Sequence, residues 1–199
     1  MITLYHSPMT RSSSILWLLE ELGVPYETQI VSFRKMDGTG TRDSANPHPH
    51  GKVPALTDGD ELVFESSAIA LYLTDKYRDA KLGPAVGEPK RGEYLSWLAY
   101  RPGVMEPSLI CRRFEIKHVY GAMGWAPAAE VEEVLNAHLA TRNYFLGEQF
   151  SALDILLGGG INFMMMAKLI TETPVLKAYT ARITDRPAFR KMMAEAAPR

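Results

Sequence analysis

Gly51-Lys52-Val53-Pro54-Ala55-Leu56 is followed, nine residues after Leu56, by Glu65-Ser66. Pro54 has no N–H and fixes its own φ. A cis Val53–Pro54 bond would turn the chain sharply and leave the Val53 N–H and C=O facing outward. An extended peptide could then pair with those groups as an added strand does. Glu65-Ser66 is expected at a strand-to-helix junction, where a helix N-terminus favours a carboxylate. The stretch therefore predicts a site for one small peptide-like ligand.

The residues before this stretch alternate between strand and helix signals. Residues 2–5 are expected to form a short strand, and residues 26–31 a second one. Ser12, Ser13 and Ser14 offer hydroxyls that could cap a helix N-terminus between them. The apolar stripe of that helix consists of Ile15, Leu18, Leu19 and Leu22. Gly23 and Pro25 then end it, which predicts a βαβ unit.

A hairpin and a helix follow a polar loop at 34–51. Residues 53–56 and 61–64 flank Asp58-Gly59, which is a strong hairpin signal. Residues 66–77 are expected to form a helix. The order β-α-β, loop, β-β-α predicts a mixed sheet with helices on its faces, an α/β fold.

Gly and Pro among charges at 79–90 indicate a linker, and the signals beyond it are helical. One long helix is expected at 94–120, with a kink at Arg101-Pro102-Gly103. A second amphipathic helix carries Val131, Val134, Leu135 and Leu139, and shorter helices are expected near 174–184 and after 187.

The pattern Ser151-Ala152-Leu153-Asp154 resembles a capping box with Asp in the place of Glu or Gln. We therefore assign Asp154 to folding. Gly158-Gly159-Gly160 lies inside a predicted helix and indicates close helix packing, not a phosphate loop. Cys111, the only cysteine, is expected to be a buried and inert thiol.

The composition of the 199 residues excludes several classes of protein. With 46% hydrophobic and 23% charged residues, the chain has ordinary globular composition. A formal net charge of −1 argues against nonspecific binding of nucleic acid or anionic membrane. One cysteine allows no intramolecular disulfide. Without a charged-then-apolar leader or an apolar run of eighteen, we expect a cytoplasmic protein.

Four segments together resemble the glutathione S-transferase family. They are Leu4-Tyr5-His6-Ser7-Pro8 with Leu18 to Glu27, Asn46-Pro47 through Leu56, Glu65 through Leu73, and Ser151 through Ile155. The match spans nearly the whole chain. The resemblance implies a thioredoxin-like domain at 1–78, a linker at 79–90 and an all-α helical domain at 91–199. It also implies a homodimer with glutathione as cosubstrate and a role in detoxification.

The resemblance leaves the catalytic residue open, because the family places a Ser, Tyr or Cys near the first turn. No cysteine is available there, and no tyrosine lies between Ser7 and Ser14. We interpret Thr10 and Ser12 as hydroxyl donors to the thiolate and Arg11 as electrostatic support. Ser7 is the alternative. The competing interpretation is that the serines only cap the helix and that Arg11 is a solvated charge.

The resemblance assigns the glutathione contacts more directly. Val53, before Pro54, would hold the cysteinyl backbone, and Glu65 and Ser66 would bind the γ-glutamyl end. For Lys52 two alternatives stay open, a contact with the glycyl carboxylate and a solvated side chain. His48 and His50 could hydrogen-bond that same end, although exposed loop histidines are the simpler expectation. A metal at these histidines is disfavoured, because neither a cysteine nor a carboxylate accompanies them.

The resulting hypothesis is a transferase that joins glutathione to a small hydrophobic electrophile. Met9, Tyr100, Met105 and Ile116 are candidates for an apolar wall of the second-substrate pocket, and Arg101 could favour an acidic electrophile. The first alternative is another glutathione reaction, by an isomerase, dehalogenase or peroxidase. The second alternative is a noncatalytic interaction module of the same fold.

Overall fold

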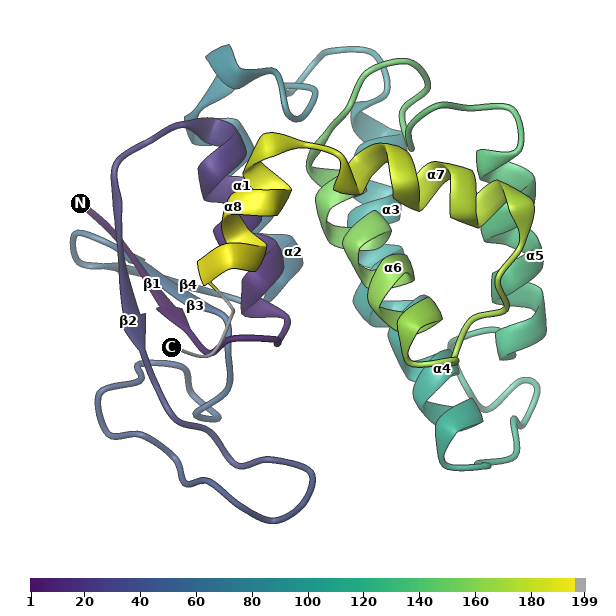
Figure 1. The fold of residues 1–199 in the computed structure, drawn as a ribbon, viewed down its shortest axis with the longest axis horizontal. Helices are drawn as coiled ribbons and strands as arrows, with labels where there is room; N and C mark the ends of the chain where they lie inside the picture. The colour runs from purple at the N-terminus through teal and green to yellow at the C-terminus, as the bar shows by residue number, and fades with distance from the viewer. Residues whose placement is uncertain (196–199) are drawn as a thin grey trace. The chain divides into compact units, whose positions relative to one another are not determined.

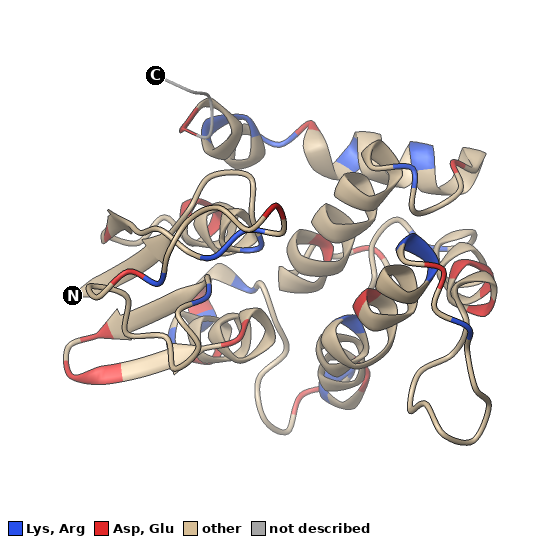
Figure 2. Ribbon diagram, turned by 90° about the horizontal axis from the view of Figure 1, so that it is seen from below, with Lys and Arg blue, Asp and Glu red and all other residues tan. Residues whose placement is uncertain are grey.

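A computed structural model describes residues 1–195 and divides the chain into two compact units. Among the described residues, one unit consists of 1–80 and 186–195, and the other of Lys81–Asp185. The last four residues of the helical domain expected at 91–199 lie outside the described part. Figure 2 shows Lys and Arg interspersed with Asp and Glu along the elements of both units. The formal charge of −1 is thus a balance of mixed local charges.

A four-stranded mixed sheet forms the centre of the first unit. Its strands are β1 (Ile2–His6), β2 (Tyr26–Ile30), β3 (Ala55–Asp58) and β4 (Glu61–Phe64), in the order β2-β1-β3-β4. β1 runs parallel to β2 and antiparallel to β3, and β4 is antiparallel to β3. With its helices, this unit has the thioredoxin-like arrangement that the resemblance implies. The predicted βαβ unit and the hairpin at Asp58-Gly59 are confirmed.

Helices α1 (Ser12–Leu22), α2 (Ser66–Lys76) and α8 (Pro187–Glu195) lie on one side of this sheet (Figure 1). Alternate residues of β1 are buried, as expected of a strand with one covered face. α8 packs on α1, where the Trp17 and Phe189 rings meet edge to face at 4.9 Å. Arg186 also binds the Glu21 carboxylate through two hydrogen bonds of 2.6 and 2.7 Å. The core of the unit consists mainly of Ile2, Leu4, Ile15, Leu16, Leu18, Leu19, Leu56, Ile69 and Leu73.

The second unit is helical. After the short 3₁₀ turn Arg78–Ala80 of the first unit, it comprises α3 (Arg91–Tyr100), η2 (Arg101–Met105), α4 (Glu106–Arg113), α5 (Ala128–Leu139), η3 (Asp154–Gly158), α6 (Gly159–Met166) and α7 (Pro174–Thr184). Among residues 1–195, no helix has both the length and the apolar character needed to cross a membrane.

The long helix expected at 94–120 is shorter than predicted. The predicted irregularity at Arg101-Pro102-Gly103 is present as the π-helical segment η2, but α4 ends at Arg113. Ile116 N–H donates to the Cys111 carbonyl (2.8 Å) and Glu115 N–H to the Arg112 carbonyl (3.2 Å). These are the two bonds of a Schellman cap, with Glu115 at φ +54° where glycine is usual. A glutamate gives no stop signal, so this helix end has no mark in the sequence. Cys111 itself is partly exposed, which corrects the expectation of a buried thiol.

The predicted capping box at Ser151 and Asp154 is confirmed. Asp154 accepts hydrogen bonds from the Ser151 N–H (2.8 Å) and hydroxyl (3.1 Å), while Leu153 N–H donates to the Ser151 hydroxyl (3.3 Å). Phe145 N–H and the Tyr179 hydroxyl also donate to Asp154, each at 2.9 Å. Burial raises the pKa of Asp154 to about 6 against the opposing effect of these bonds. Asp154 therefore ties three segments of the helical unit together.

Glycine at 158 permits the close helix packing that the sequence predicted. A Cβ there would lie 2.5 Å from both Ile183 Cδ1 and the Tyr179 hydroxyl. Two other expectations for this unit were wrong. Met105 is completely buried, so it offers no wall to a ligand. Arg101 is only 4% exposed and lies 3.1 Å from the Glu106 carboxylate, so its charge is already balanced.

Candidate active site

The loop before β3 is held by its own asparagine. Asn46 Nδ2 donates to the Lys52 carbonyl (2.9 Å), and its Oδ1 accepts from His48 N–H (3.0 Å). The Val53–Pro54 bond is cis, which meets the condition that the sequence analysis set for an outward-facing Val53 backbone. Pairing of β3 with β1 begins at Ala55, so Val53 precedes the paired segment. Asn46 is 5% exposed, so its amide fixes the loop from inside.

Glu65 stands at the junction of β4 and α2, as predicted. Its backbone is at φ +70°, ψ +126°, a conformation that non-glycine residues rarely adopt. Its side chain is 68% exposed and makes no capping bond to α2. Ser66 is the first residue of α2 and is partly buried. A carboxylate and a hydroxyl thus stand at the N-terminus of an 11-residue helix, whose free N–H groups attract anions.

His48 is buried, which corrects the expectation of an exposed loop histidine. Its ring is 3% exposed and meets Phe64 edge to face at 5.4 Å. Nδ1 accepts a hydrogen bond from His50 N–H (3.1 Å), which leaves Nε2 to carry the proton in the neutral ring. Nε2 lies 4.0 Å from Glu65 Oε1. Burial lowers the pKa of His48, and the Glu65 carboxylate opposes that shift. Sequence reasoning had no signal for this contact.

The first turn after β1 contains a compact group of polar side chains. The Ser12 hydroxyl is completely buried, 2.7 Å from His6 Nδ1 and 2.7 Å from the Thr10 hydroxyl. Ser7 N–H donates to Ser12 Oγ (3.2 Å), and Thr10 Oγ1 donates to the Ser7 carbonyl (2.7 Å). The N-cap position of α1 is Arg11, whose side chain makes no capping bond, and Thr10 Oγ1 accepts from the Ser12 N–H (3.2 Å). Ser12 therefore bonds inside the turn and does not cap, contrary to the capping interpretation.

Thr10 and Ser7, the alternative donor, are both partly exposed, whereas Ser12 is buried. Arg11 is exposed beside Thr10. His6 lies on the buried face of β1, and burial lowers its pKa to about 4. The imidazole is consequently neutral at pH 7, and it can either donate to or accept from Ser12. Thr10, Ser12 and His6 form a continuous row of groups that can each pass or hold a proton.

The sheet register brings the polar first turn and the region of Val53–Pro54 and Glu65 to the same edge of the sheet. Tyr5 pairs with Ala55, which places the end of β1 beside the start of β3. Ala55 in turn pairs with Phe64, which places the end of β4 at the same edge. The first turn follows β1, the Val53–Pro54 bond precedes β3, and Glu65 follows β4. These three strand ends are neighbours in the sheet. Lys52, just before them, is exposed.

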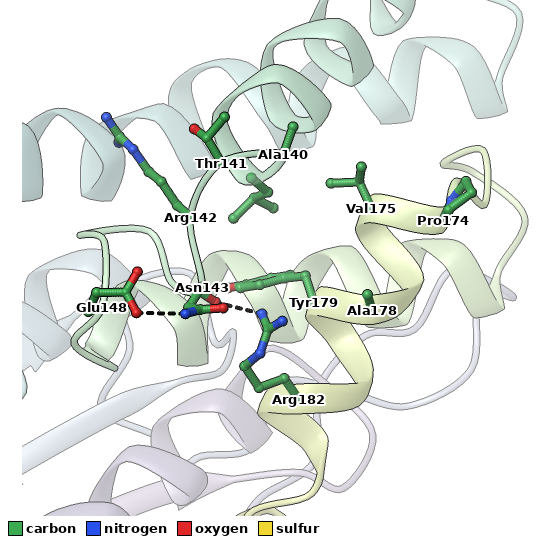
Figure 3. Close-up of a pocket in the computed structure, with 11 residues that line it drawn as sticks. Ala140, Thr141, Arg142, Asn143, Glu148, Pro174, Val175, Ala178, Tyr179 and Arg182 are labelled. Atoms are coloured by element: carbon green, nitrogen blue, oxygen red, sulfur yellow. Dashed lines mark hydrogen bonds between the residues drawn. The ribbon is translucent and has the colours of Figure 1, made fainter.

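The helical unit contains a hollow that none of the predicted site residues lines. It measures about 530 Å³ and lies between the end of α5, residues 140–148 and α7 (Figure 3). Arg182 donates to the Asn143 carbonyl (2.9 Å), and the Asn143 amide donates to Glu148 (2.6 Å). These polar groups bind one another, so the hollow offers less to a ligand than its size indicates. Within residues 1–195, no group of three His, Cys, Asp or Glu residues is placed to hold a metal ion.

Comparisons with known proteins agree on one family. Residues 1–75 match the family described as glutathione S-transferase, N-terminal domain. The chain is 28% identical to glutathione S-transferase 3 of Schizosaccharomyces pombe, over 96% of this chain and 86% of that protein. It is 30% identical to the glutathione S-transferase-like protein OpS6 of Beauveria bassiana, over 89% and 87%. A solved sphingomonad glutathione S-transferase complexed with glutathione is similar at 29% identity and a TM-score of 0.76, over 98% of each chain.

Proposed function

This chain belongs to the glutathione S-transferase family and is a glutathione transferase, and we propose that it joins the glutathione thiolate to a small hydrophobic electrophile. The observation that carries the proposal is the meeting of Val53–Pro54 and Glu65-Ser66 at one edge of the sheet. A peptide there has free backbone to pair with on one side and a helix N-terminus on the other.

Glutathione binding is divided among four residues in this proposal. The Val53 backbone pairs with the cysteinyl unit, and Glu65 with Ser66 binds the ammonium and carboxylate of the γ-glutamyl end. Lys52 reaches the glycyl carboxylate. Support comes from the exposed Glu65 carboxylate, which makes no capping bond to α2. His48 Nε2 lies 4.0 Å from this carboxylate.

The thiolate is the nucleophile, because a neutral thiol with a pKa of about 8.5 attacks poorly at pH 7. Lowering the thiol pKa by about 2 units takes about 2.7 kcal/mol of preferential thiolate binding. We propose that the Thr10 hydroxyl donates to the sulfur and that Arg11 adds positive potential. The Thr10 proton then turns from the Ser7 carbonyl to the sulfur, and the Ser12 hydroxyl, 3.1 Å from that carbonyl, replaces it as the donor there. His6 Nδ1–H can in turn donate to Ser12.

The chemical step is a displacement or an addition. The sulfur lone pair forms a C–S bond to the electrophilic carbon, and the leaving group departs with its electron pair or the electrons move onto an acceptor. The protein's contribution is orientation together with thiolate stabilisation. In this scheme Ser12 acts through Thr10, because its own hydroxyl is buried.

The experiment combines retention on immobilised glutathione with turnover of an aryl halide electrophile. Retention together with a saturable rate of thioether formation is the expected result. Loss of retention contradicts the assigned peptide site. Retention without turnover of several aryl halides and epoxides would instead point to isomerisation, peroxide reduction or binding alone.

We further propose a cytoplasmic homodimer that acts in detoxification, as the family resemblance implies. A single cysteine, which cannot form an intramolecular disulfide, suits a reducing compartment. Sedimentation velocity over a range of concentrations tests the dimer. A species with the mass of one chain at every concentration contradicts it.

A further inference from the structure

One imidazole connects the two halves of the proposed peptide site. His48 lies in the loop that leads to Val53, and its backbone N–H donates to Asn46 Oδ1 (3.0 Å). The amide nitrogen of the same asparagine holds the loop carbonyl directly before Val53 (2.9 Å). The His48 ring meets Phe64, the last residue of β4, and approaches Glu65, the residue that follows. His48 is therefore joined to both the Val53 side and the Glu65 side of the site.

The His48 ring has little freedom to move. It is 3% exposed and packs edge to face on Phe64, with 5.4 Å between the ring centroids. Its Nδ1 accepts the His50 N–H at 3.1 Å, which places the proton of the neutral ring on Nε2. The backbone N–H, Nδ1 and the ring edge of His48 are thus all held. Together these contacts fix the place of its Nε2–H.

Glu65, by contrast, combines a constrained backbone with a free side chain. Non-glycine residues keep a φ of +70° and a ψ of +126° only where the surrounding structure imposes them. The side chain is 68% exposed, and within residues 1–195 its one ion-pair contact is with His48. Oε1 lies 4.0 Å from His48 Nε2, and a shift of about 1 Å would bring the two atoms to hydrogen-bond distance. A fixed donor therefore stands beside a movable acceptor.

The charge of His48 matters as much as its position. Burial lowers the pKa of His48, and Arg42, His50 and Lys52 nearby lower it as well, whereas the Glu65 carboxylate raises it. The ring is therefore neutral at pH 7. A neutral N–H can orient a carboxylate without cancelling its charge, which a lysine or arginine in the same place would do. Glu65 consequently keeps a full negative charge for a ligand.

We propose that His48 is a positioning residue for glutathione: its Nε2–H holds one oxygen of the Glu65 carboxylate, so that the other oxygen faces the ammonium group of the γ-glutamyl end. This inference rests on the proposed function, in which Glu65 pairs with that ammonium group. Because His48 belongs to the loop before Val53, it also keeps this carboxylate in register with the backbone that holds the cysteinyl unit. The ligand that such an arrangement favours is a γ-glutamyl thiol with a free amino group.

Two ligands and two variants of the full-length protein test the proposal by calorimetric titration at pH 7. The ligands are glutathione and its deamino analogue, glutaryl-cysteinylglycine, which lacks only the ammonium group. His48→Asn can still accept the His50 N–H but has no donor at the Nε2 position, whereas the longer side chain of His48→Gln can place an amide N–H there. We expect His48→Asn to bind glutathione roughly three- to tenfold more weakly than wild type, and to bind the deamino analogue equally well. His48→Gln should restore most of the affinity for glutathione.

A double-mutant cycle with Glu65→Gln shows whether His48 acts through Glu65. If it does, His48→Asn should change the affinity for glutathione little in the Glu65→Gln protein. An undiminished effect in that protein would contradict the inference. His50→Asn, at an exposed position of the same loop, is the matched control. Whatever this control does to the affinity for either ligand, the ratio of the two affinities should stay that of wild type.

Two further results would overturn the inference alone. One is an equal loss of affinity for both ligands in His48→Asn, which means that the histidine merely supports the loop. The other is that His48→Gln binds glutathione as weakly as His48→Asn, which means that the Nε2 donor has no part. A failure of the proposed function looks different, because wild type then binds neither ligand or binds both equally. In that case the pairing of Glu65 with the ammonium group is wrong, and the role of His48 is wrong with it.

Discussion

Two buried histidines stand at the same edge of the sheet, and they differ in what surrounds them. His6 contacts the Ser12 hydroxyl, whose other neighbours are the hydroxyl of Thr10 and the backbone of Ser7. His48 is fixed by the His50 N–H and lies 4.0 Å from the Glu65 carboxylate. Burial lowers both pKa values, but only His48 has a nearby carboxylate that opposes the shift.

This difference separates two tasks. Hydroxyl groups can reverse the direction of a hydrogen bond by rotation, so the His6 group can redistribute protons. Backbone donors cannot rotate, so the His48 group holds one tautomer and one position. Under the proposed function, the first arrangement suits chemistry at the sulfur of glutathione, and the second suits the positioning of Glu65, the proposed partner of the γ-glutamyl end. Substitutions in each group should therefore affect different measured quantities.

Thr10→Val should have the largest effect, because it removes the proposed donor to the thiolate without changing the shape of the side chain. We expect kcat to fall by about 10²- to 10³-fold, as when one oxyanion donor is lost. The dissociation constant of glutathione should change by no more than roughly threefold. Steady-state rates and the ultraviolet absorbance of the bound thiolate provide the measurements.

Thr10→Ser is the matched variant, and it should retain most of the activity. Thr28→Val, on the exposed part of β2, controls for threonine loss elsewhere in the unit. An unchanged thiolate pKa in Thr10→Val would show that another group, such as Ser7, contacts the sulfur.

Asn46→Ala should be next in size. It removes the two hydrogen bonds of a buried amide, to the Lys52 carbonyl and from His48 N–H. We expect the free energy of unfolding to drop by about 2 kcal/mol and glutathione binding to weaken. The thiolate pKa of whatever glutathione still binds should not change. Denaturant unfolding and calorimetric titration measure these quantities.

Asn46→Asp serves as the partial variant, because its oxygen can still accept from His48 N–H. Its free energy of unfolding and its affinity for glutathione should lie between those of wild type and Asn46→Ala. If Asn46→Ala instead raises the thiolate pKa and leaves binding intact, the proposed division between the two groups is wrong.

His6→Asn tests the pH dependence of stability. An imidazole in the unfolded chain has a pKa of about 6.5, and that of His6 in the fold is about 4. The folded state therefore binds fewer protons, and stability is lost as pH falls from about 6.5 towards 4. We expect His6 to account for about 3 kcal/mol of that loss by pH 4. Asparagine can keep a bond to Ser12 but does not titrate.

The comparison is made by unfolding wild type and variant at several pH values between 7 and 4. His50→Asn, at an exposed position of the same unit, is the control. The raised pKa of Asp154 acts in the opposite direction over this range, and it is common to all three proteins. Parallel pH curves for wild type and His6→Asn would refute the assignment of a buried neutral imidazole.

Glu65→Gln should have the smallest effect of these substitutions. It distinguishes His48 from His6 most directly, because only the pKa of His48 should respond. The carboxylate raises the pKa of His48 against the effect of burial, so its removal should lower the pKa of His48 further. The pKa of His6 should stay the same. Ring-proton NMR titration distinguishes the two histidines. A fall in both pKa values, or in neither, would contradict the assigned 4.0 Å pair.

Local patterns account for most of the predicted elements. The βαβ unit, the hairpin at Asp58-Gly59 and the capping box at Ser151 each depend on residues close together in the sequence. The end of α4 was not predicted, because no local pattern marks it. Glu115 takes a positive φ that its residue type does not indicate. Likewise, hydroxyls before an apolar run predict caps, yet Ser12 binds His6 from β1 instead.

The sequence by itself determined the family, the order of strands and helices in the first unit, and the place of Glu65 between a strand and a helix, because spacing along the chain carries that information. Only the tertiary structure decided that His48 is buried with its Nε2 4.0 Å from the Glu65 carboxylate, and that Arg101 is paired with Glu106. Burial and hydrogen bonding between distant residues depend on how the elements pack. No local pattern records that packing.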